Sequence, residues 1–235
     1  MLKKIFNNFF VINMDEHPDR YNLFVEEMKK YRIENFERIP GIKINGGIKT
    51  KDRWDGNKWS HYRCVELASQ RKLNYAIICE DDVIFDERFL NNNILSDFYK
   101  FIKNETWDMF YFGIHYKSIP KYTTYEYINQ VLKGYAIHCY AIHSRCYDLV
   151  IDNFWNKEFN LMSGDMTYAN LVHPKGQCFV ASPRIALQRQ GFSYASQKNK
   201  DYNSTLKEIS FKDRLVKENI QTLYKKNKKI KDKNG

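Results

Sequence analysis

The segment that most constrains the fold of this chain is Tyr75–Phe85, with the sequence YAIICEDDVIF. Its first five residues carry no formal charge, and such a short run rich in β-branched residues predicts a buried strand, central in a parallel sheet. Three adjacent carboxylates follow, Glu80, Asp81 and Asp82, which repel one another and resist burial. We expect them where the strand emerges at its carboxyl edge, since open α/β sheets bind ligands there. Clustered carboxylates at that edge suit a hard divalent cation and, through it, a phosphate-bearing ligand.

The rest of the sequence alternates between strand and helix patterns, which predicts an α/β fold with a mostly parallel mixed sheet flanked by helices. We expect residues 43–58 to form a loop because they combine three glycines with many charges. Ser60 would then cap the next helix, and residues 114–131 would form a loop over the site. The expected strands are 9–13, 36–39, 75–79, 107–112, 135–142 and 177–181, and the expected helices are 19–31, 61–73, 89–104, 144–155, 163–172 and 209–224.

Charge divides the chain into a body and a tail. Residues 1–206 hold 28 Lys and Arg against 24 Asp and Glu, whereas residues 207–235 hold 10 against 4. With no internal repeat and no linker, the simplest division is one domain over 1–206 and an amphipathic helix with a lysine-rich tail over 207–235. A basic end of this kind is usually solvated; an anionic membrane surface or a nucleic-acid backbone are its alternative partners.

Cysteine usage and hydropathy bear on location. The five cysteines are scattered and never form a Cys-x-x-Cys pair, which argues against a disulfide framework or zinc site and for a reducing cytoplasm. No apolar run approaches the length of a membrane span, and the N-terminus lacks the cleavage site of a signal peptide. We therefore expect a cytoplasmic protein, with peripheral contact at the inner membrane surface as the alternative.

Four ordered blocks of sequence resemble glycosyltransferase family 25, which includes lipooligosaccharide galactosyltransferases and procollagen galactosyltransferase domains. The most specific block contains a Ser-His helix followed by the Glu-Asp-Asp strand. Together the matching blocks cover roughly residues 9–195 at the level of pattern. They are FVINMDEHPDRY (10–21), RIPGIKINGG (38–47), SHYRCVELASQRKLNYAIICEDDVIF (60–85), and the pair WDMFYFG (107–113) and GYAIHCYAIHSRCYDLVI (134–151).

The resemblance implies a GT-A type nucleotide-binding domain that uses a cluster of acids with Mn²⁺ or Mg²⁺. It also implies a nucleotide-sugar donor, which we expect to be UDP-linked. Mg²⁺ and Mn²⁺ often need only one or two carboxylates besides phosphates and water. Asp82 is the first candidate metal ligand and Glu80 the second, while Asp81 is expected to reach the ribose or the sugar.

Other donor-side candidates lie near the ends of strands and the starts of helices. Asn13 and Asp15 follow the first strand and are candidates for base or ribose contacts. Arg20 is a candidate for the diphosphate, with an ion pair at a helix start as the alternative. His61 is assigned to the donor site by the family pattern, and Gln188 to closing the site on the acceptor or the diphosphate.

Transfer with inversion needs a general base that takes the proton of the acceptor hydroxyl. Asp165, in SGDMTYA, is the first candidate, because the start of a helix keeps a carboxylate ionised; a capping role fits the same position. Asp108, in WDMFYFG, is the competing candidate.

The function expected from these residues and the resemblance is metal-dependent transfer of a hexose or similar sugar to a hydroxyl acceptor, foremost a saccharide of a surface glycolipid. A hydroxylated protein side chain or a modified DNA base is the alternative acceptor. The alternative class is a two-metal phosphodiesterase or nuclease built on Glu80, Asp81, Asp82, Asp108 and Asp165. A third hypothesis is a binding protein in which the acids form a solvated turn.

Overall fold

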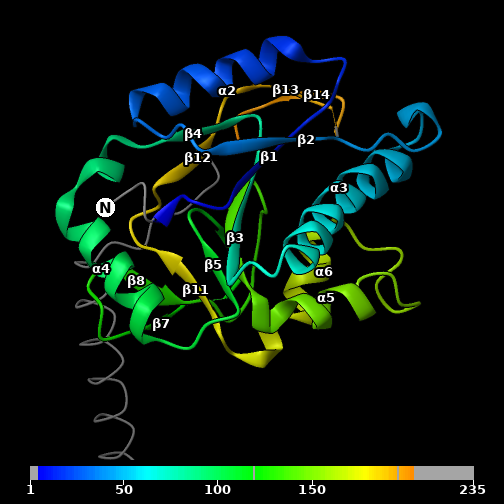
Figure 1. Ribbon diagram of the computed structural model, residues 1–235. Helices are drawn as coiled ribbons and strands as arrows, with labels where there is room; N and C mark the ends of the chain where they lie inside the picture. The colour runs from blue at the N-terminus through cyan, green and yellow to red at the C-terminus, as the bar shows by residue number, and fades with distance from the viewer. Residues whose placement is uncertain (1–4, 119, 195, 204–235) are drawn as a thin grey trace, which may run out of the picture.

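The protein is built around one eight-stranded mixed sheet (Figure 1). The computed structural model describes residues 5–118, 120–194 and 196–203. The strand order is β2-β1-β3-β10-β5-β11-β8-β7, and only β8 and β10 run against the direction of the others. The strands are β1 (Phe9–Asn13), β2 (Phe36–Pro40), β3 (Tyr75–Glu80), β5 (Met109–Tyr111), β7 (Lys121–Tyr122), β8 (Ile128–Gln130), β10 (Cys139–His143) and β11 (Cys178–Ala181).

The central strands are buried on both faces, because alternate side chains pack into two different cores. In β1, Phe9 and Val11 belong to one core, whereas Phe10 and Ile12 belong to the other. In β3, Ile77 enters the first core and Ile78 the second. The uncharged run that precedes the three acids is therefore a central strand covered on both sides.

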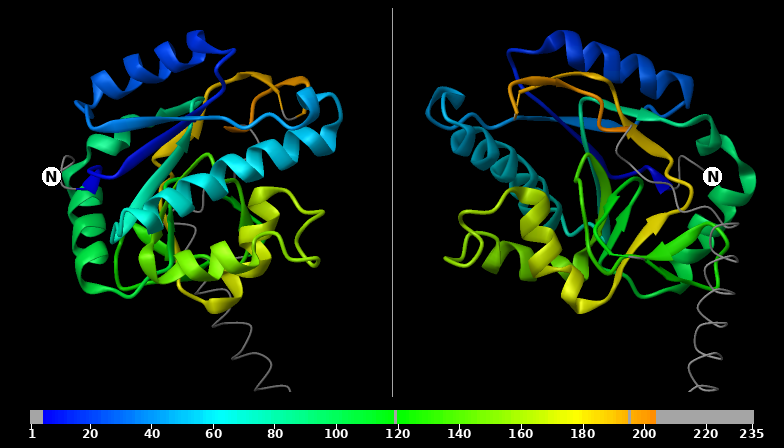
Figure 2. Two further views of the ribbon diagram at one scale, coloured as in Figure 1. Left: turned by 45° about the vertical axis from the view of Figure 1, so that its right-hand side comes forward. Right: turned by 180° about the vertical axis from the view of Figure 1, so that it is seen from behind.

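Helices cover both faces of the sheet (Figure 2). The first core includes side chains from α2 (Pro18–Lys30) and α4 (Asn92–Asn104). The second core includes side chains from α3 (Thr50–Gln70), α5 (Tyr147–Asn153) and α6 (Gly164–Leu171). This arrangement confirms the predicted α/β class, with a mixed sheet between two helical layers. Short 3₁₀ turns complete the list: η1 (Asn45–Gly47), η2 (Glu87–Leu90), η3 (Ser144–Cys146) and η4 (His173–Lys175).

Helix α3 begins much earlier than predicted, so the expected loop over 43–58 and the expected cap at Ser60 are wrong. Ser60 is buried inside the helix, where its hydroxyl donates to Gly56 O (2.7 Å) and accepts from Ile42 N (2.8 Å). Gly56 does not break the helix, because it lets the backbone of the preceding segment approach: a Cβ there would lie 2.3 Å from Ile42 O. The glycine that suggested a loop is instead a packing position.

The segment 114–131 is also more ordered than predicted. It contains β6 (His115–Tyr116), which pairs with β9 (Gly134–Tyr135), and then β7 and β8 at the edge of the main sheet. The expected helix 144–155 starts as the 3₁₀ turn η3, capped by the His143 side chain rather than by Ser144. The expected helix over 209–224 lies outside the described residues.

Two small antiparallel pairs lie next to the carboxyl end of β3. Strand β4 (Val83–Phe85) pairs with β12 (Ala186–Gln188), which brings Gln188 opposite Val83. Strands β13 (Gly191–Ser193) and β14 (Lys198–Lys200) form a second pair. These pairs bring the last described part of the chain to the acids at the end of β3.

None of the helices in the described part of the chain is long and apolar enough to cross a membrane. The five cysteines are buried free thiols.

Candidate active site

A cavity of about 720 Å³ lies at the carboxyl end of β3, and the three acids line it. Cavities of this size accommodate substrates and cofactors of moderate size. Glu80 is the last residue of β3, and Asp81 and Asp82 form the turn to β4. Of the ten candidate residues from the sequence, six line the cavity: Arg20, Glu80, Asp81, Asp82, Asp165 and Gln188.

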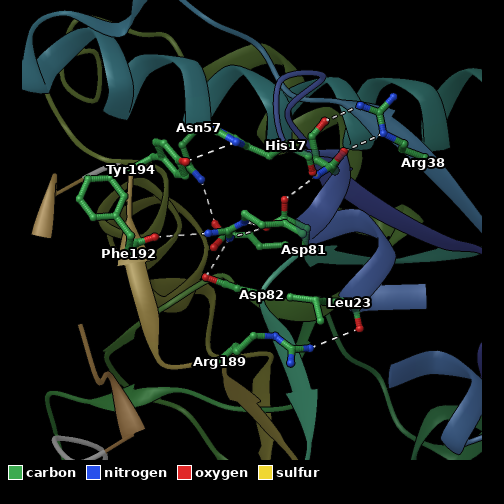
Figure 3. A network of polar contacts seen from close by, with 12 residues as sticks. His17, Leu23, Arg38, Asn57, Asp81, Asp82, Arg189, Phe192 and Tyr194 are labelled. Carbon is green, nitrogen blue, oxygen red and sulfur yellow. Dashed lines mark hydrogen bonds and ion pairs between the residues drawn. The ribbon is translucent and has the colours of Figure 1, made fainter. Parts of the chain in front are cut away.

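Asp81 is held by three donors (Figure 3). Its Oδ1 accepts from Arg20 Nε at 2.8 Å and also from Arg20 Nη2, and its Oδ2 accepts from Asn13 Nδ2 at 2.7 Å. A guanidinium that donates twice to one carboxylate fixes it in place. Burial opposes the charge of Arg20, but the bonds to Asp81 and the nearby acids raise the pKa of Arg20 further above its usual range. Asp81 is therefore a fixed anion with few remaining lone pairs.

Asn13 and Asp15 lie behind the cavity wall rather than in it. Asn13 Nδ2 also donates to His17 O (2.9 Å), and its Oδ1 accepts from Arg38 Nε (2.9 Å). Arg38 in turn pairs with the exposed Asp15 at 2.5 Å. The structure does not place Asn13 or Asp15 in the cavity wall, and their predicted contacts with a base or ribose stay predictions; Asn13 supports Asp81.

Glu80 is held from helix α3. Its Oε1 accepts from Asn57 Nδ2 at 2.8 Å and contacts His61 Nε2 at 3.2 Å, while His61 Nδ1 lies 3.1 Å from Tyr140 OH. Burial alone would raise the pKa of Glu80, but the bonds from His61 and Asn57 outweigh it and lower that pKa to about 2. His61 is fully buried and does not line the cavity, so it acts on the site through Glu80.

Asp82 is paired with its counter-charge, Arg20, less closely than Asp81 is. Its Oδ1 is shielded from water and has no hydrogen-bond partner among the described residues, and Arg20 Nη2 lies 3.4 Å from its Oδ2. Burial first, and the negative charge of Glu80 second, raise the pKa of Asp82 to about 7. A buried carboxylate oxygen without a partner is costly, so this position favours a bound cation.

The acids fit a divalent cation that is completed by a ligand. No three side chains of metal-binding type already surround one point in the ranges that the structure describes. Mg²⁺ and Mn²⁺, however, are commonly held by one or two carboxylates together with phosphate oxygens and water. Asp82 and Glu80 remain for this role, since Asp81 is committed to Arg20 and Asn13.

Asp165 reaches the same cavity from helix α6. Ser163 is the N-cap residue of this helix, and its hydroxyl donates to Asp165 Oδ1 at 2.5 Å, as does Met166 N at 2.9 Å. In the described part of the chain no hydrogen bond is formed by Asp165 Oδ2. One carboxylate oxygen thus anchors the side chain and the other can accept a proton.

Asp108 does not belong to this site. It precedes β5 at the amino end of that strand, where Asp108 N donates to Gln177 O and Asp108 O accepts from His143 N. Because β5 runs in the same direction as β3, this end lies at the edge of the sheet opposite to Glu80. The position does not suit a base for chemistry at the acids, and it also removes one ligand from the two-metal hypothesis.

Gln188 enters the cavity through the pairing of β12 with β4. Arg189 N donates to Asp82 O at 2.6 Å, and the Gln188 backbone exchanges hydrogen bonds with the Asn203 side chain at 3.1 and 2.6 Å. Gln188 also lowers the pKa of Asp82, against the larger opposing effect of burial. The structure therefore brings Gln188 into the cavity beside the acids, and its predicted role of closing the site on the acceptor or the diphosphate stays a prediction.

Several cavity residues were not foreseen. The sequence pattern predicts a loop for Trp54 and Asn57, but both lie in α3. A predicted helix that began before residue 54 would have placed Asn57 four residues from His61, on the same face. Tyr194 stacks against His17 with ring centroids 4.0 Å apart, and Arg20 lies 5.9 Å from the Tyr194 ring (Figure 3). No local pattern relates these two distant segments.

Comparisons with known proteins agree with the site. A family model described as "Glycosyltransferase family 25 (LPS biosynthesis protein)" matches residues 56–132, which include Asn57, His61 and the three acids. No curated protein matches the sequence significantly.

Among solved structures, a glycosyltransferase involved in the glycosylation of the major capsid of PBCV-1 has 12% sequence identity and a TM-score of 0.49, covering 81% of this chain and 96% of its own. A197 from STIV has 13% identity and a TM-score of 0.48, covering 86% of this chain and 96% of its own. These likenesses are too distant to say more about the site. Over residues 56–132, which carry the three acids together with Asn57 and His61, the chain is similar to glycosyltransferase family 25.

Proposed function

We propose that the protein transfers a hexose or similar sugar from a UDP-linked donor to a hydroxyl acceptor, with Mn²⁺ or Mg²⁺ as cofactor, in a domain of the GT-A type. The observation that supports this most directly is the unpartnered Oδ1 of Asp82 at the wall of the cavity. Three acids meet there with Arg20 as a nearby cation that is already bonded to Asp81. Such a site gains from a divalent cation together with the diphosphate that the cation neutralises.

On the donor side, each residue has a separate task. Asp82 and Glu80 would hold the cation, which when bound supplies positive charge against the departing diphosphate. Asp81, fixed by Arg20 and Asn13, presents an anion of constant position toward hydroxyl groups of the donor. Gln188 orients Asp82 from the opposite strand.

On the acceptor side, Asp165 is the proposed general base. The bond between the sugar's anomeric carbon and the diphosphate oxygen breaks, a bond from that carbon to the acceptor oxygen forms, and the acceptor proton passes to Asp165. The two bonds to Asp165 Oδ1 from Ser163 and Met166 hold the carboxylate in position while Oδ2 accepts. UDP then leaves as the second product.

The test is the linkage between UDP and metal. Isothermal titration of the full chain with UDP should give at least about tenfold tighter binding with Mn²⁺ than without, which corresponds to about 1.4 kcal/mol. Asp82→Asn preserves the shape of the side chain but removes its charge, and it should abolish this metal-dependent gain.

Asp148→Asn is the matched control, because Asp148 is an exposed acid in the first turn of α5 that does not line the cavity. It should bind UDP and Mn²⁺ like the unmodified protein. Equal UDP affinity with and without Mn²⁺, or an Asp82→Asn variant that keeps the gain, would contradict the proposal.

For the acceptor and the location we propose a saccharide of a surface glycolipid, met at the inner face of the cytoplasmic membrane. The description of the matched family as an LPS biosynthesis protein supports this choice. The excess of basic residues over 207–235 suits an anionic lipid surface. A hydroxylated protein side chain and a modified DNA base are the competing acceptors.

A further inference from the structure

One aromatic residue that lines the cavity, Trp54, has no role in the proposed donor chemistry. Trp54 lines the cavity from the second turn of α3, and 44% of it remains exposed. We propose that Trp54 is the platform on which a pyranose ring of the acceptor stacks, beside the Asp165 carboxylate. This inference rests on the proposed function and adds the residue that would bind its saccharide acceptor.

The position of Trp54 follows from the geometry of α3. Residues three and four apart lie on one face of a helix, so Trp54, Asn57 and His61 form one row. Asn57 and His61 both contact Glu80 Oε1. Trp54 therefore lies one helical turn from the Asn57–Glu80 contact, on the side of the cavity away from His61.

The same part of α3 also adjoins the proposed base. Gly164 directly precedes Asp165, and a Cβ on Gly164 would lie 3.7 Å from Asn57 Oδ1 and 3.7 Å from Lys58 Cα. Lys58 Nζ donates to Phe159 O at 2.7 Å, which ties the segment before α6 to α3. Gly164, the neighbour of Asp165, thus adjoins Asn57, which lies three residues after Trp54, and Trp54 and Asp165 line the same cavity. We place the acceptor with its hydroxyl at Asp165 and its ring over the indole.

The surroundings match a pyranose, which has an apolar C–H face and a polar hydroxyl edge. An indole offers a large rigid apolar face at little cost in conformational entropy. Polar groups for the hydroxyl edge come from Asn57, Ser163 and Asp165, all of which line the cavity. Binding sites typically combine an apolar wall with a few polar groups in this way.

Charge disfavours a nucleic-acid acceptor at the same platform. The acids Asp52, Glu80 and Asp165 line the cavity on this side and would repel a phosphate backbone. The nearby cations have partners in the protein: Lys51 pairs with Asp55 at 2.5 Å, and Arg53 Nη1 donates to Gly47 O and Ile48 O.

Trp59 provides a matched control on the same helix. It has a similar exposure of 37%, but it stacks on Trp155 with ring centroids 4.3 Å apart and does not line the cavity of the acids. Replacing Trp59 by alanine shows the general effect of losing a half-exposed indole from α3, while Trp54 stays in place.

The experiment measures binding of methyl β-D-galactopyranoside, methyl β-D-glucopyranoside and lactose to the full chain by saturation-transfer NMR, with UDP and Mn²⁺ present. At least one pyranoside should bind, and Trp54→Ala should weaken it at least tenfold, whereas Trp54→Phe should keep most of the affinity. Trp59→Ala should bind like the unmodified protein. UDP affinity, measured separately, should stay within twofold in all variants, and thermal unfolding should show each variant folded.

Each other outcome contradicts the inference. If no pyranoside binds, or if Trp54→Ala binds as well as the unmodified protein, the platform does not exist. If Trp54→Ala loses UDP affinity as well, the indole contacts the nucleotide instead. If a hydroxylysine peptide or a hydroxymethylcytosine oligonucleotide binds in a Trp54-dependent manner and the pyranosides do not, the acceptor class is wrong. Failure of the proposed function itself is distinguishable, because UDP would then show no Mn²⁺-dependent binding to the unmodified protein.

Discussion

At the scale of the residue, the acid cluster shows how neighbours in sequence acquire opposite properties. Asp81 accepts from Arg20 and Asn13, whereas Asp82 keeps one buried oxygen without a partner among the described residues. Glu80, one position earlier, has its pKa lowered to about 2 against the effect of burial by bonds from His61 and Asn57, and Asp82 has its pKa raised to about 7 by burial and by Glu80. The pattern Glu-Asp-Asp identifies the acids, but partners from distant segments divide the tasks among them.

The buried His173 allows a prediction about pH and stability, away from the cavity. Its Nε2 lies 2.8 Å from Tyr111 OH, and burial lowers the pKa of His173 to about 4. The unfolded chain binds a proton near pH 6.5, so stability from the neutral ring is complete above that pH and is lost as pH falls toward 4. Between pH 8 and pH 5 this single group should cost about 2 kcal/mol of the free energy of unfolding.

Urea denaturation of the unmodified protein and of His173→Gln at pH 8 and pH 5 measures this cost. Glutamine can still bond to Tyr111 but does not titrate, so the variant should lose less stability on acidification. A stability difference between the two proteins that is the same at both pH values would disprove the assignment. Because the unmodified protein and His173→Gln share all other titrating groups, the contributions of those groups to the pH dependence cancel in the difference.

At the scale of the element, helix α3 is the part of the site that sequence patterns described least well. Propensity counts Gly56 as unfavourable in a helix, by roughly 0.5–1 kcal/mol relative to alanine. The close approach of Ile42 O to this glycine and the Ser60 hydroxyl that joins the two segments outweigh that preference. Tertiary contacts therefore extend the helix to Thr50, and with it Asn57 and Trp54 enter the cavity wall.

Gly56→Ala tests this account, because propensity and packing predict opposite signs. A Cβ at this position would lie 2.3 Å from Ile42 O, a backbone atom that cannot rotate away. We expect a net loss of about 1–3 kcal/mol in the free energy of unfolding, in the range of overpacked cores. Urea denaturation checks it, with Gly191→Ala as the control, since no atom lies within 4 Å of a Cβ there. A more stable Gly56→Ala would mean that propensity dominates.

Strands were easier to predict than helix starts for a physical reason. Strand β1 was placed at its observed bounds, and β3 and β11 within one residue, because their uncharged runs are buried on both faces. The short strands β6 to β9 lack such runs, so their pairing depends on neighbours that no local pattern reveals. Asp108 illustrates the same limit: its sequence context resembles that of a site residue, but strand direction puts it at the far edge of the sheet.

At the scale of the whole molecule, the fold gathers residues far apart in sequence at one edge of the sheet. The cavity is lined by residues from α2, α3, the end of β3, α6 and β12. The α/β class and the location of the acids could be predicted from alternating strands and helices. The contributions of Tyr194 and Trp54 could not, because they depend on how the last described segment and α3 lie against that edge.

The distribution of charge gives a prediction for the full chain. Residues 207–235 lie outside the described residues. Their sequence contains 10 Lys and Arg against 4 Asp and Glu. Deletion of this segment should greatly reduce co-sedimentation with phosphatidylglycerol vesicles at low salt and leave Mn²⁺-dependent UDP binding unchanged. Neutral phosphatidylcholine vesicles provide the comparison, because the attraction is electrostatic. Vesicle binding that survives the deletion would show that another surface is responsible.

The tight crossing of α3 over Ile42 has a consequence for how the specificity of this cavity could change in evolution. Helix α3 is held against Ile42 at Gly56 and Ser60. The same helix carries Asn57, whose amide donates to Glu80, and has exposed side chains near its first turn. Changes upstream of the fastening point alter the mouth of the cavity, while the strands and their acids keep their places. New acceptors could therefore evolve by exchanging the cavity residues Asp52, Arg53 and Trp54, without rebuilding the machinery that handles the donor.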